Sequence, residues 1–251
     1  MSGHSKWSTI KHKKGINDAR RGKIFTQLAR GIAMTAREGG GDPEVNFNLR
    51  LAIEKARAAN MPKDNISRAI KRGTGEDKDA AALEKIIYEA YAPHGIALVI
   101  ETVTDNRNRT VAAMRHTLTK AGGNLGENGS VAWQFAQKAY FVFETGDHKE
   151  DDIFEMAVNA GADDVIYDQE TIEIIGSADA FKEISDALKD ADIQTIQADL
   201  RMFPNQEMTL DVPETLQVLK VIEELEDHDD IQKVDSNLSI TDEALSELET
   251  A

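Results

Sequence analysis

The sequence predicts an α+β multidomain protein, in which an N-terminal three-helix domain precedes two α/β domains with ferredoxin-like, antiparallel-rich sheets. Three observations predict this class. Apolar residues recur at helical spacing in the first 75 residues, β-rich and helical segments alternate after residue 85, and the sign of the charge reverses near residue 75.

Three amphipathic helices are expected in the N-terminal domain. Glycines at 39–41 end the first helix, and residues 73–75 end the third. Asp42 is the expected N-cap of the second helix, followed by a first-position proline, and Pro62 begins the third. The apolar faces are formed, helix by helix, by Ile24, Leu28 and Ile32, by Val45, Leu49, Ile53 and Ala56, and by Ile66, Ala69 and Ile70.

The rest of the chain alternates strands and helices. A turn signal at residues 92–95 separates the first two strands, and glycines at 122–126 follow the first helix of this part. The order from residue 139 to 203 is βαββαβ, the ferredoxin-like pattern. The expected strands are 86–91, 96–103, 131–135, 139–143, 163–167, 171–175, 194–203, 208–212 and 231–234, and the expected helices are 109–121, 151–160, 178–190 and 213–226.

Two distant segments are expected to share one sheet, because residues 86–135 have the order ββαβ and the tail has the order βαβ. We therefore predict three domains. They are a basic helical domain at 1–80, a discontinuous α/β domain at 83–135 plus 205–251, and an inserted βαββαβ domain at 136–204. The alternative is two sequential domains, in which strand 131–135 lies beside a different sheet.

The composition of the 251-residue chain is that of a soluble globular protein, with 41% hydrophobic and 29% charged residues. The absence of cysteine excludes disulfides, thiolate zinc sites and a cysteine nucleophile. No apolar stretch approaches the ~20 residues of a membrane helix, and no apolar segment follows the basic residues of the N-terminus. We expect a cytoplasmic protein that makes no membrane contact.

The charge is divided unevenly along the chain. Residues 1–75 hold 16 basic and 6 acidic residues, a net charge of +10, whereas residues 76–251 hold 13 basic and 39 acidic residues, a net charge of −26. Affinity for DNA or RNA comes largely from Lys and Arg that neutralise phosphates. The basic N-terminal third is therefore the expected nucleic-acid-binding part.

Most of the basic density lies between residues 6 and 23, where Trp7 could stack on a base. For Trp7, a core or interface anchor is favoured over base stacking. For the arm at residues 2–15, contact with nucleic acid is favoured over the alternative of a solvated tail. Further basic residues up to Arg72 extend the surface over the helices. The predicted nucleic-acid-binding residues are Lys6, Lys11, Lys13, Lys14, Arg20, Arg21, Lys23 and Arg30.

Residues 105–110 are a second candidate, because they lie between a strand and a helix, where free N–H groups can hold an anion. Arg107 and Arg109 could add forked hydrogen bonds to a phosphate. The alternative, a plain Asp or Asn cap with surface arginines, is slightly favoured. The glycine-rich residues 122–129 lack a Gly-Lys-Ser/Thr ending and follow a helix, so they are interpreted as a loop.

Signals for catalysis are weak. The six histidines are scattered without metal-ligand spacing, and no Gly-x-Ser-x-Gly motif occurs. Acidic residues at 223–230 have the pattern of a solvated surface. We expect no enzymatic activity, no cofactor and no metal, and the sequence does not predict an oligomeric state.

Several segments together resemble the YebC/PmpR family. The opening residues 3–25, the segment Asn60-Met61-Pro62-Lys63-Asp64-Asn65-Ile66, the segment Tyr88-Glu89-Ala90-Tyr91 with Pro93-His94-Gly95, residues 104–110 and Gly129-Ser130-Val131-Ala132-Trp133 carry the resemblance. It implies three domains and a DNA-binding transcriptional regulator of the bacterial cytoplasm. Relatives in that family are also translational activators or are linked to stalled ribosomes.

Three functions follow as expectations. The first is a non-enzymatic DNA-binding transcriptional regulator. The second is a ribosome-associated translation factor that binds ribosomal RNA through the same basic surface. The third is a protein-interaction or small-ligand module with an anion site at Arg107 and Arg109. The first is favoured, with DNA as the partner.

Overall fold

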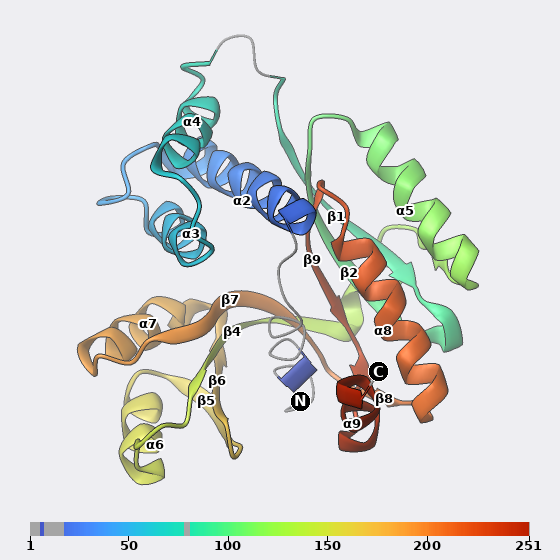
Figure 1. Ribbon diagram of the computed structural model, residues 1–251. Helices are drawn as coiled ribbons and strands as arrows, with labels where there is room; N and C mark the ends of the chain where they lie inside the picture. Colours follow the sequence, from blue (N-terminus) through green and yellow to red (C-terminus); the bar gives the residue numbers. More distant parts are fainter. Residues whose placement is uncertain (1–5, 8–17, 78–80, 251) are drawn as a thin grey trace. The chain divides into compact units, whose positions relative to one another are not determined.

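Figure 1 shows the computed structural model, which describes residues 6–7, 18–77 and 81–250. The chain divides into two compact units. The larger unit comprises Gly15–Val131 and Gln217–Val234, and the smaller unit comprises Met1–Lys14, Ala132–Leu216 and Asp235–Ala251. The predicted three-domain boundaries stay a prediction. No helix within the described ranges has the length and apolarity needed to cross a membrane.

The larger unit begins with the expected three helices, α2 (Asp18–Gly39), α3 (Phe47–Ala58) and α4 (Lys63–Thr74). Their apolar faces form one core, and each large apolar side chain buried there contributes about 1.5–3 kcal/mol to folding. The buried members of this core are Ile32, Ala36, Leu49, Ile53, Ala56, Met61, Ile66 and Ala69.

The start of α3 differs from the prediction. Asn46, not Asp42, is the N-cap: its Oδ1 accepts a hydrogen bond from the Leu49 amide at 3.1 Å. Its Nδ2 also donates to Gly40 O at 2.7 Å, which ties the end of α2 to the start of α3. Asp42 only closes a local turn, by accepting from the Glu44 amide. Val45, predicted on the apolar face, precedes the helix and is 79% exposed.

Helices α2 and α4 approach closely at Gly73. A Cβ atom there would lie 2.2 Å from the carbonyl oxygen of Ala33 and 2.8 Å from the Cβ of Ala36. Both distances are far below van der Waals contact, so this crossing requires a glycine.

The first sheet has the strand order β3-β1-β2-β9. Strand β1 is antiparallel to both β2 and β3, and β9 comes from the tail, as predicted, and lies beside β2 (Figure 1). The strands of this sheet are β1 (Glu84–Tyr91), β2 (Ala97–Thr104), β3 (Asn124–Leu125) and β9 (Ile231–Ser236). The associated helices are α5 (Arg107–Ala121) and α8 (Val212–Glu226).

Glu89 of β1 holds the loop that follows β3. Its carboxylate is buried and accepts hydrogen bonds from the amides of Gly129 and Val131, both at 2.6 Å. Tyr91, two residues further, donates from its hydroxyl to Ser130 O at 3.1 Å. Two of the segments that carry the family resemblance are thus joined to each other by hydrogen bonds.

We expect Glu89→Gln to lower the free energy of unfolding by about 1.5 kcal/mol, because the amide group replaces one charged acceptor with a donor that faces an N–H group. Urea denaturation followed by circular dichroism measures this loss. Glu127→Gln, an exposed change in the same loop, is the matched control and should have almost no effect. Equal stability of the two variants would contradict this role of Glu89.

The smaller unit contains the predicted ferredoxin-like sheet, with order β5-β6-β4-β7 and antiparallel neighbours throughout. Its core includes Phe141, whose ring centroid lies 4.7 Å from that of Phe181. The strands are β4 (Phe135–Glu144), β5 (Ala162–Tyr167), β6 (Thr171–Ser177) and β7 (Thr195–Pro204). The helices are α6 (Glu150–Asn159) and α7 (Phe181–Asp190), the latter preceded by a 3₁₀ turn.

Two strand predictions are wrong. Residues 131–135 form no strand of the first sheet: Ala132–Gln134 is a 3₁₀ turn and Phe135 begins β4. The strand that pairs with β1 in the first sheet, besides β2, is β3, inside the segment interpreted as a loop. The tail strand at 208–212 is only β8 (Met208–Thr209), which pairs in parallel with β10 (Leu238–Ser239). The last helix, α9 (Asp242–Thr250), was not predicted.

Candidate nucleic-acid interface

Helices α3 and α4 carry seven basic residues against two acidic residues, Glu54 and Asp64. Five of these basic side chains are exposed, and we call them the helical basic surface. Its members are Lys55, Arg57, Lys63, Arg68 and Lys71. On these two helices the exposed cations outnumber the exposed carboxylates five to two, a charge excess typical of segments that contact a phosphate backbone.

Helix α2 adds further basic residues at its start. Arg21 is exposed and its guanidinium lies 5.9 Å from the centroid of the Phe25 ring. Lys23 is also exposed, with Asp227 Oδ2 at 4.0 Å. Arg20 lies in α2, but its side chain is outside the described part of the structure. Lys11, Lys13 and Lys14 lie outside the described residues altogether.

Lys6 belongs to the smaller unit, whereas the three helices belong to the larger unit. Its ammonium lies 2.7 Å from Asp168 Oδ2 and 3.1 Å from Asp242 Oδ1. The hydrogen bond to Asp168 raises the pKa of Lys6 more than burial lowers it. The neighbouring Trp7 is 8% exposed, which favours the anchor interpretation over base stacking.

Arg30 is committed to a carboxylate within the larger unit. Its Nη1 donates to Asp230, and the side chains of both residues are about nine-tenths buried. Gln27, one turn earlier in α2, donates to the carbonyl oxygens of Glu226 at 2.6 Å and His228 at 3.1 Å. Arg30 therefore fastens α2 to the segment before β9, and its charge is already compensated.

Arg109 of the candidate anion site meets the same carboxylate. Its Nη2 lies 2.9 Å from Asp230 Oδ1 and 3.0 Å from Asp105 Oδ1. Thr110 donates its hydroxyl to Asp230 Oδ2 at 2.7 Å, and Asn106 caps α5 by accepting from the Arg109 amide at 3.1 Å. The protein's own carboxylates thus occupy the place where an external anion was expected.

Asp230 is the centre of this network. Burial alone would raise its pKa, but the hydrogen bonds from Thr110 and Arg109 and the charge of Arg30 outweigh burial and hold the pKa below its ordinary value. Arg107, in contrast, is exposed, and its side chain has no hydrogen bond or ion pair among the described residues. Only Arg107 of the two predicted arginines is available to an external anion.

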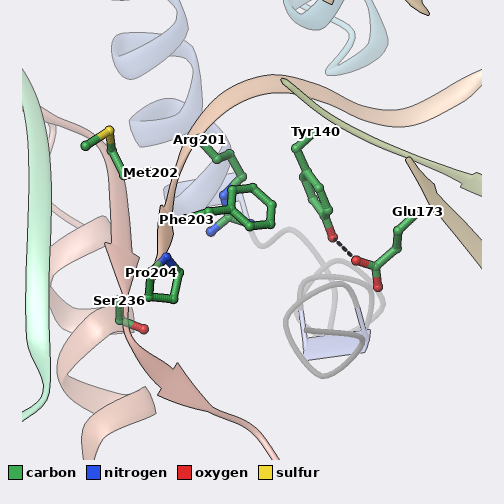
Figure 2. A pocket seen from close by; sticks show the side chains of 7 residues that line it. All are labelled: Tyr140, Glu173, Arg201, Met202, Phe203, Pro204 and Ser236. Carbon is green, nitrogen blue, oxygen red and sulfur yellow. Dashed lines mark hydrogen bonds between the residues drawn. The ribbon is translucent and has the colours of Figure 1, made fainter. Parts of the chain in front are cut away.

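A pocket in the smaller unit is the main alternative to a surface site (Figure 2). The Tyr140 hydroxyl donates to Glu173 at 2.9 Å, and Arg201 lies 5.4 Å from the Tyr140 ring centroid. Arg201 in turn binds Asp235 at 2.8 Å. The lining residues are Tyr140, Glu173, Arg201, Met202, Phe203, Pro204 and Ser236.

The serine that lines the pocket, Ser236, is not placed as a nucleophile. The Ser236 hydroxyl is buried and has no hydrogen-bond partner within the described part of the chain, so no neighbouring base activates it. Among the described residues, no group of three or more His, Asp or Glu side chains lies where it could hold a metal ion.

Sequence reasoning missed the carboxylates that pair with these cations. Asp230 lies in an acidic run that has the pattern of a solvated surface, and Asp168 and Asp242 lie in unremarkable acidic segments. A weak signal existed for Asp230, since the predicted strand 231–234 directly follows it. Its basic partners, however, lie 121 residues (Arg109) and 200 residues (Arg30) away in sequence.

Comparisons with known proteins cover nearly the whole chain. The TACO1/YebC protein N-terminal domain matches residues 5–76, and the TACO1/YebC second and third domain matches residues 83–238. A relative from Dictyoglomus turgidum is 49% identical, over 99% of this chain and 100% of its own length. A relative from Chloroflexus aurantiacus is 51% identical, over 98% of each chain. Both are named "Probable transcriptional regulatory protein".

A solved structure agrees with the fold. The crystal structure of a conserved hypothetical protein from Aquifex aeolicus superimposes with a TM-score of 0.82 at 39% identity, over 90% of this chain and 93% of that chain. The family matches therefore extend through both the helical region and the two sheets. The chain belongs to the TACO1/YebC family.

Proposed function

We propose that this protein is a DNA-binding transcriptional regulatory protein that catalyses no reaction and contacts DNA through the cations of its three-helix region. The observation that carries the proposal is the helical basic surface, where exposed Lys and Arg side chains far outnumber acidic ones. The names of the relatives from Dictyoglomus turgidum and Chloroflexus aurantiacus support transcriptional regulation.

The proposed interface combines the helical basic surface with the start of the chain. Arg30 is left out, because Asp230 holds its guanidinium. Lys6 is left out, because Asp168 and Asp242 hold its ammonium in the free protein. Arg107 is an additional candidate for one phosphate. The predicted contacts are Lys11, Lys13, Lys14, Arg20, Arg21 and Lys23 together with Lys55, Arg57, Lys63, Arg68 and Lys71.

The contacts available to this surface are mainly contacts to phosphate. Lys and Arg on exposed helix positions neutralise the backbone and release counterions, and such contacts fix position without reading sequence. We therefore expect modest sequence preference. The same chemistry would bind ribosomal RNA, so a ribosomal target is an outcome of the test below.

We expect binding to a short random-sequence DNA duplex to depend steeply on salt. If about six phosphates are neutralised, log K should fall against log salt with a slope near −5. Fluorescence anisotropy over a salt series measures the slope. A slope near zero would refute the proposed binding through phosphate contacts. If the protein co-sediments with ribosomes but does not bind the duplex, its target is ribosomal RNA and not DNA.

The site itself is tested with Arg57, Lys63 and Lys71 replaced together by Ala. All three are exposed, and their side chains have no hydrogen bond or ion pair among the described residues, so the fold should survive. The slope should become shallower by about 3, roughly one for each cation. The matched control replaces Lys120, Lys182 and Lys189, which are exposed on α5 and α7. Equal losses in the two variants would contradict the proposed interface.

A further inference from the structure

The N-terminal segment is held by two carboxylates of the smaller unit, which we call the acidic seat: Asp168, just after β5, and Asp242, at the start of α9. The Lys6 ammonium lies 2.7 Å from Asp168 Oδ2 and 3.1 Å from Asp242 Oδ1. The Asp168 side chain is 19% exposed and that of Lys6 is 35% exposed. The Asp242 side chain is 86% exposed, so only the contact with Asp168 is partly shielded from water, where ion pairs are stronger than on an open surface.

The two partners stabilise each other's charged forms. The hydrogen bond with Lys6 lowers the pKa of Asp168, and the same bond raises the pKa of Lys6. Trp7, the next residue, is 8% exposed. A lysine in an ion pair and a buried tryptophan therefore anchor the same short segment.

The seat lies in a strongly acidic environment. In residues 132–216 and 235–251, which form the smaller unit beyond its first 14 residues, there are 5 basic and 25 acidic residues, a net charge of −20. Lys11, Lys13 and Lys14 of the same basic arm follow Lys6 within eight positions. The carboxylates of the smaller unit and the phosphates of a nucleic acid can therefore both form ion pairs with the basic residues of the arm.

We propose that the acidic seat is a docking site for the protein's own N-terminal arm, and that nucleic acid competes with the seat for this arm. In the free protein, Asp168 and Asp242 hold Lys6, and binding of a polyanion releases Lys6 and Trp7 from their places. This inference rests on the proposed nucleic-acid binding. The seat then weakens binding to any polyanion, because only the fraction of molecules with a released arm binds fully.

The first test removes the seat with Asp168→Asn and Asp242→Asn together. Asn at 168 retains the oxygen that accepts from the Gln169 amide at 2.6 Å, so the local turn is preserved. The matched control is Asp186→Asn with Glu243→Gln, which removes the same charge from exposed positions of the smaller unit that do not contact Lys6. We expect duplex DNA affinity to rise about three- to tenfold in the seat variant and far less in the control.

The second test observes the arm directly. Trp7 and Trp133 are the two tryptophans of the chain, and Trp133 is 72% exposed. In a Trp133→Phe protein, Trp7 is the sole tryptophan and its buried indole should emit at short wavelength. Saturation with duplex DNA should shift the emission to longer wavelength and raise quenching by acrylamide, and the seat variant should show part of this shift without DNA.

The outcomes separate this inference from the proposed function. If no variant binds duplex DNA or ribosomal RNA, the proposed function fails and the inference fails with it. If the protein binds with the expected salt slope but the seat and control variants have equal affinity, the competition is refuted and the proposed function stands. Trp7 emission unchanged at saturating DNA would likewise refute the release of the arm.

Discussion

Replacing Asp230 by Ala is expected to lower the free energy of unfolding by about 3 kcal/mol, because it leaves a buried cation without its counter-charge. Asp230 is 6% exposed and accepts hydrogen bonds from Arg30, Arg109 and Thr110. Its removal leaves the Arg30 guanidinium, whose side chain is 12% exposed, without its counter-charge. Arg109 is half exposed and can turn to water, so most of the cost comes from Arg30.

Urea denaturation followed by circular dichroism measures this loss, and Asp229→Ala is the matched control. Asp229 is the exposed neighbour of Asp230 and should have almost no effect. If both variants lose the same stability, the network does not hold the helices to the sheet.

The pH dependence gives a second measure of Asp230. Because its folded pKa is lowered, its stabilisation is complete above the ordinary aspartate pKa of about 3.9 and is lost as the pH falls through the folded value. The difference in stability between the wild-type protein and Asp230→Asn should therefore shrink below about pH 4. A difference that stayed constant over this interval would show that charge is not the cause.

Gly73→Ala is expected to cost about 2 kcal/mol, even though Ala is the better helix former by about 1 kcal/mol. The added Cβ would lie 2.2 Å from the carbonyl oxygen of Ala33, which is a backbone atom and cannot rotate away. Helices α2 and α4 would have to separate, which opens the apolar core between them. Thermal or urea denaturation measures the loss.

Gly22→Ala is the matched control for this prediction. Gly22 also lies in a helix, α2, but no atom outside its local backbone lies within 4 Å of an added Cβ. The change should stabilise the protein by about 0.5–1 kcal/mol through helix propensity alone. If both glycine variants change stability in the same direction, the close crossing at Gly73 is not tight.

The helices and most strands could be predicted because their signals are local. The i, i+4 spacing of Ile24, Leu28 and Ile32 identifies α2 without knowledge of the rest of the chain. Capping was predicted less well, since Asp42 and Asn46 are both suitable caps in sequence. Only the position of the α2 carbonyls, which Asn46 also binds, decides between them. β3 is two residues long and was missed, because a strand that short has no periodicity.

The sequence shows where positive charge is concentrated, but it does not show which cations are already paired. The basic excess before residue 75 places the positive surface on the three helices, because charge is a property of the sequence. Which cations are already paired depends on contacts across the fold: Lys6 meets Asp242 at a separation of 236 residues and Arg30 meets Asp230 at 200. No local pattern encodes such pairs.

The position of β9 in the first sheet also determines when this sheet can be completed during synthesis of the chain. A ribosome completes Arg30 and Arg109 long before it completes Asp230. The 121 residues from Arg109 to Asp230 take roughly 6–24 s to synthesise at about 5–20 residues per second. During that time the first sheet lacks its tail strand and the two guanidinium groups lack their carboxylate. The four strands of the second sheet lie within Phe135–Pro204 and are complete sooner. Arg30 and Arg109 thus gain the counter-charge of Asp230 only after all four strands of the second sheet have been synthesised.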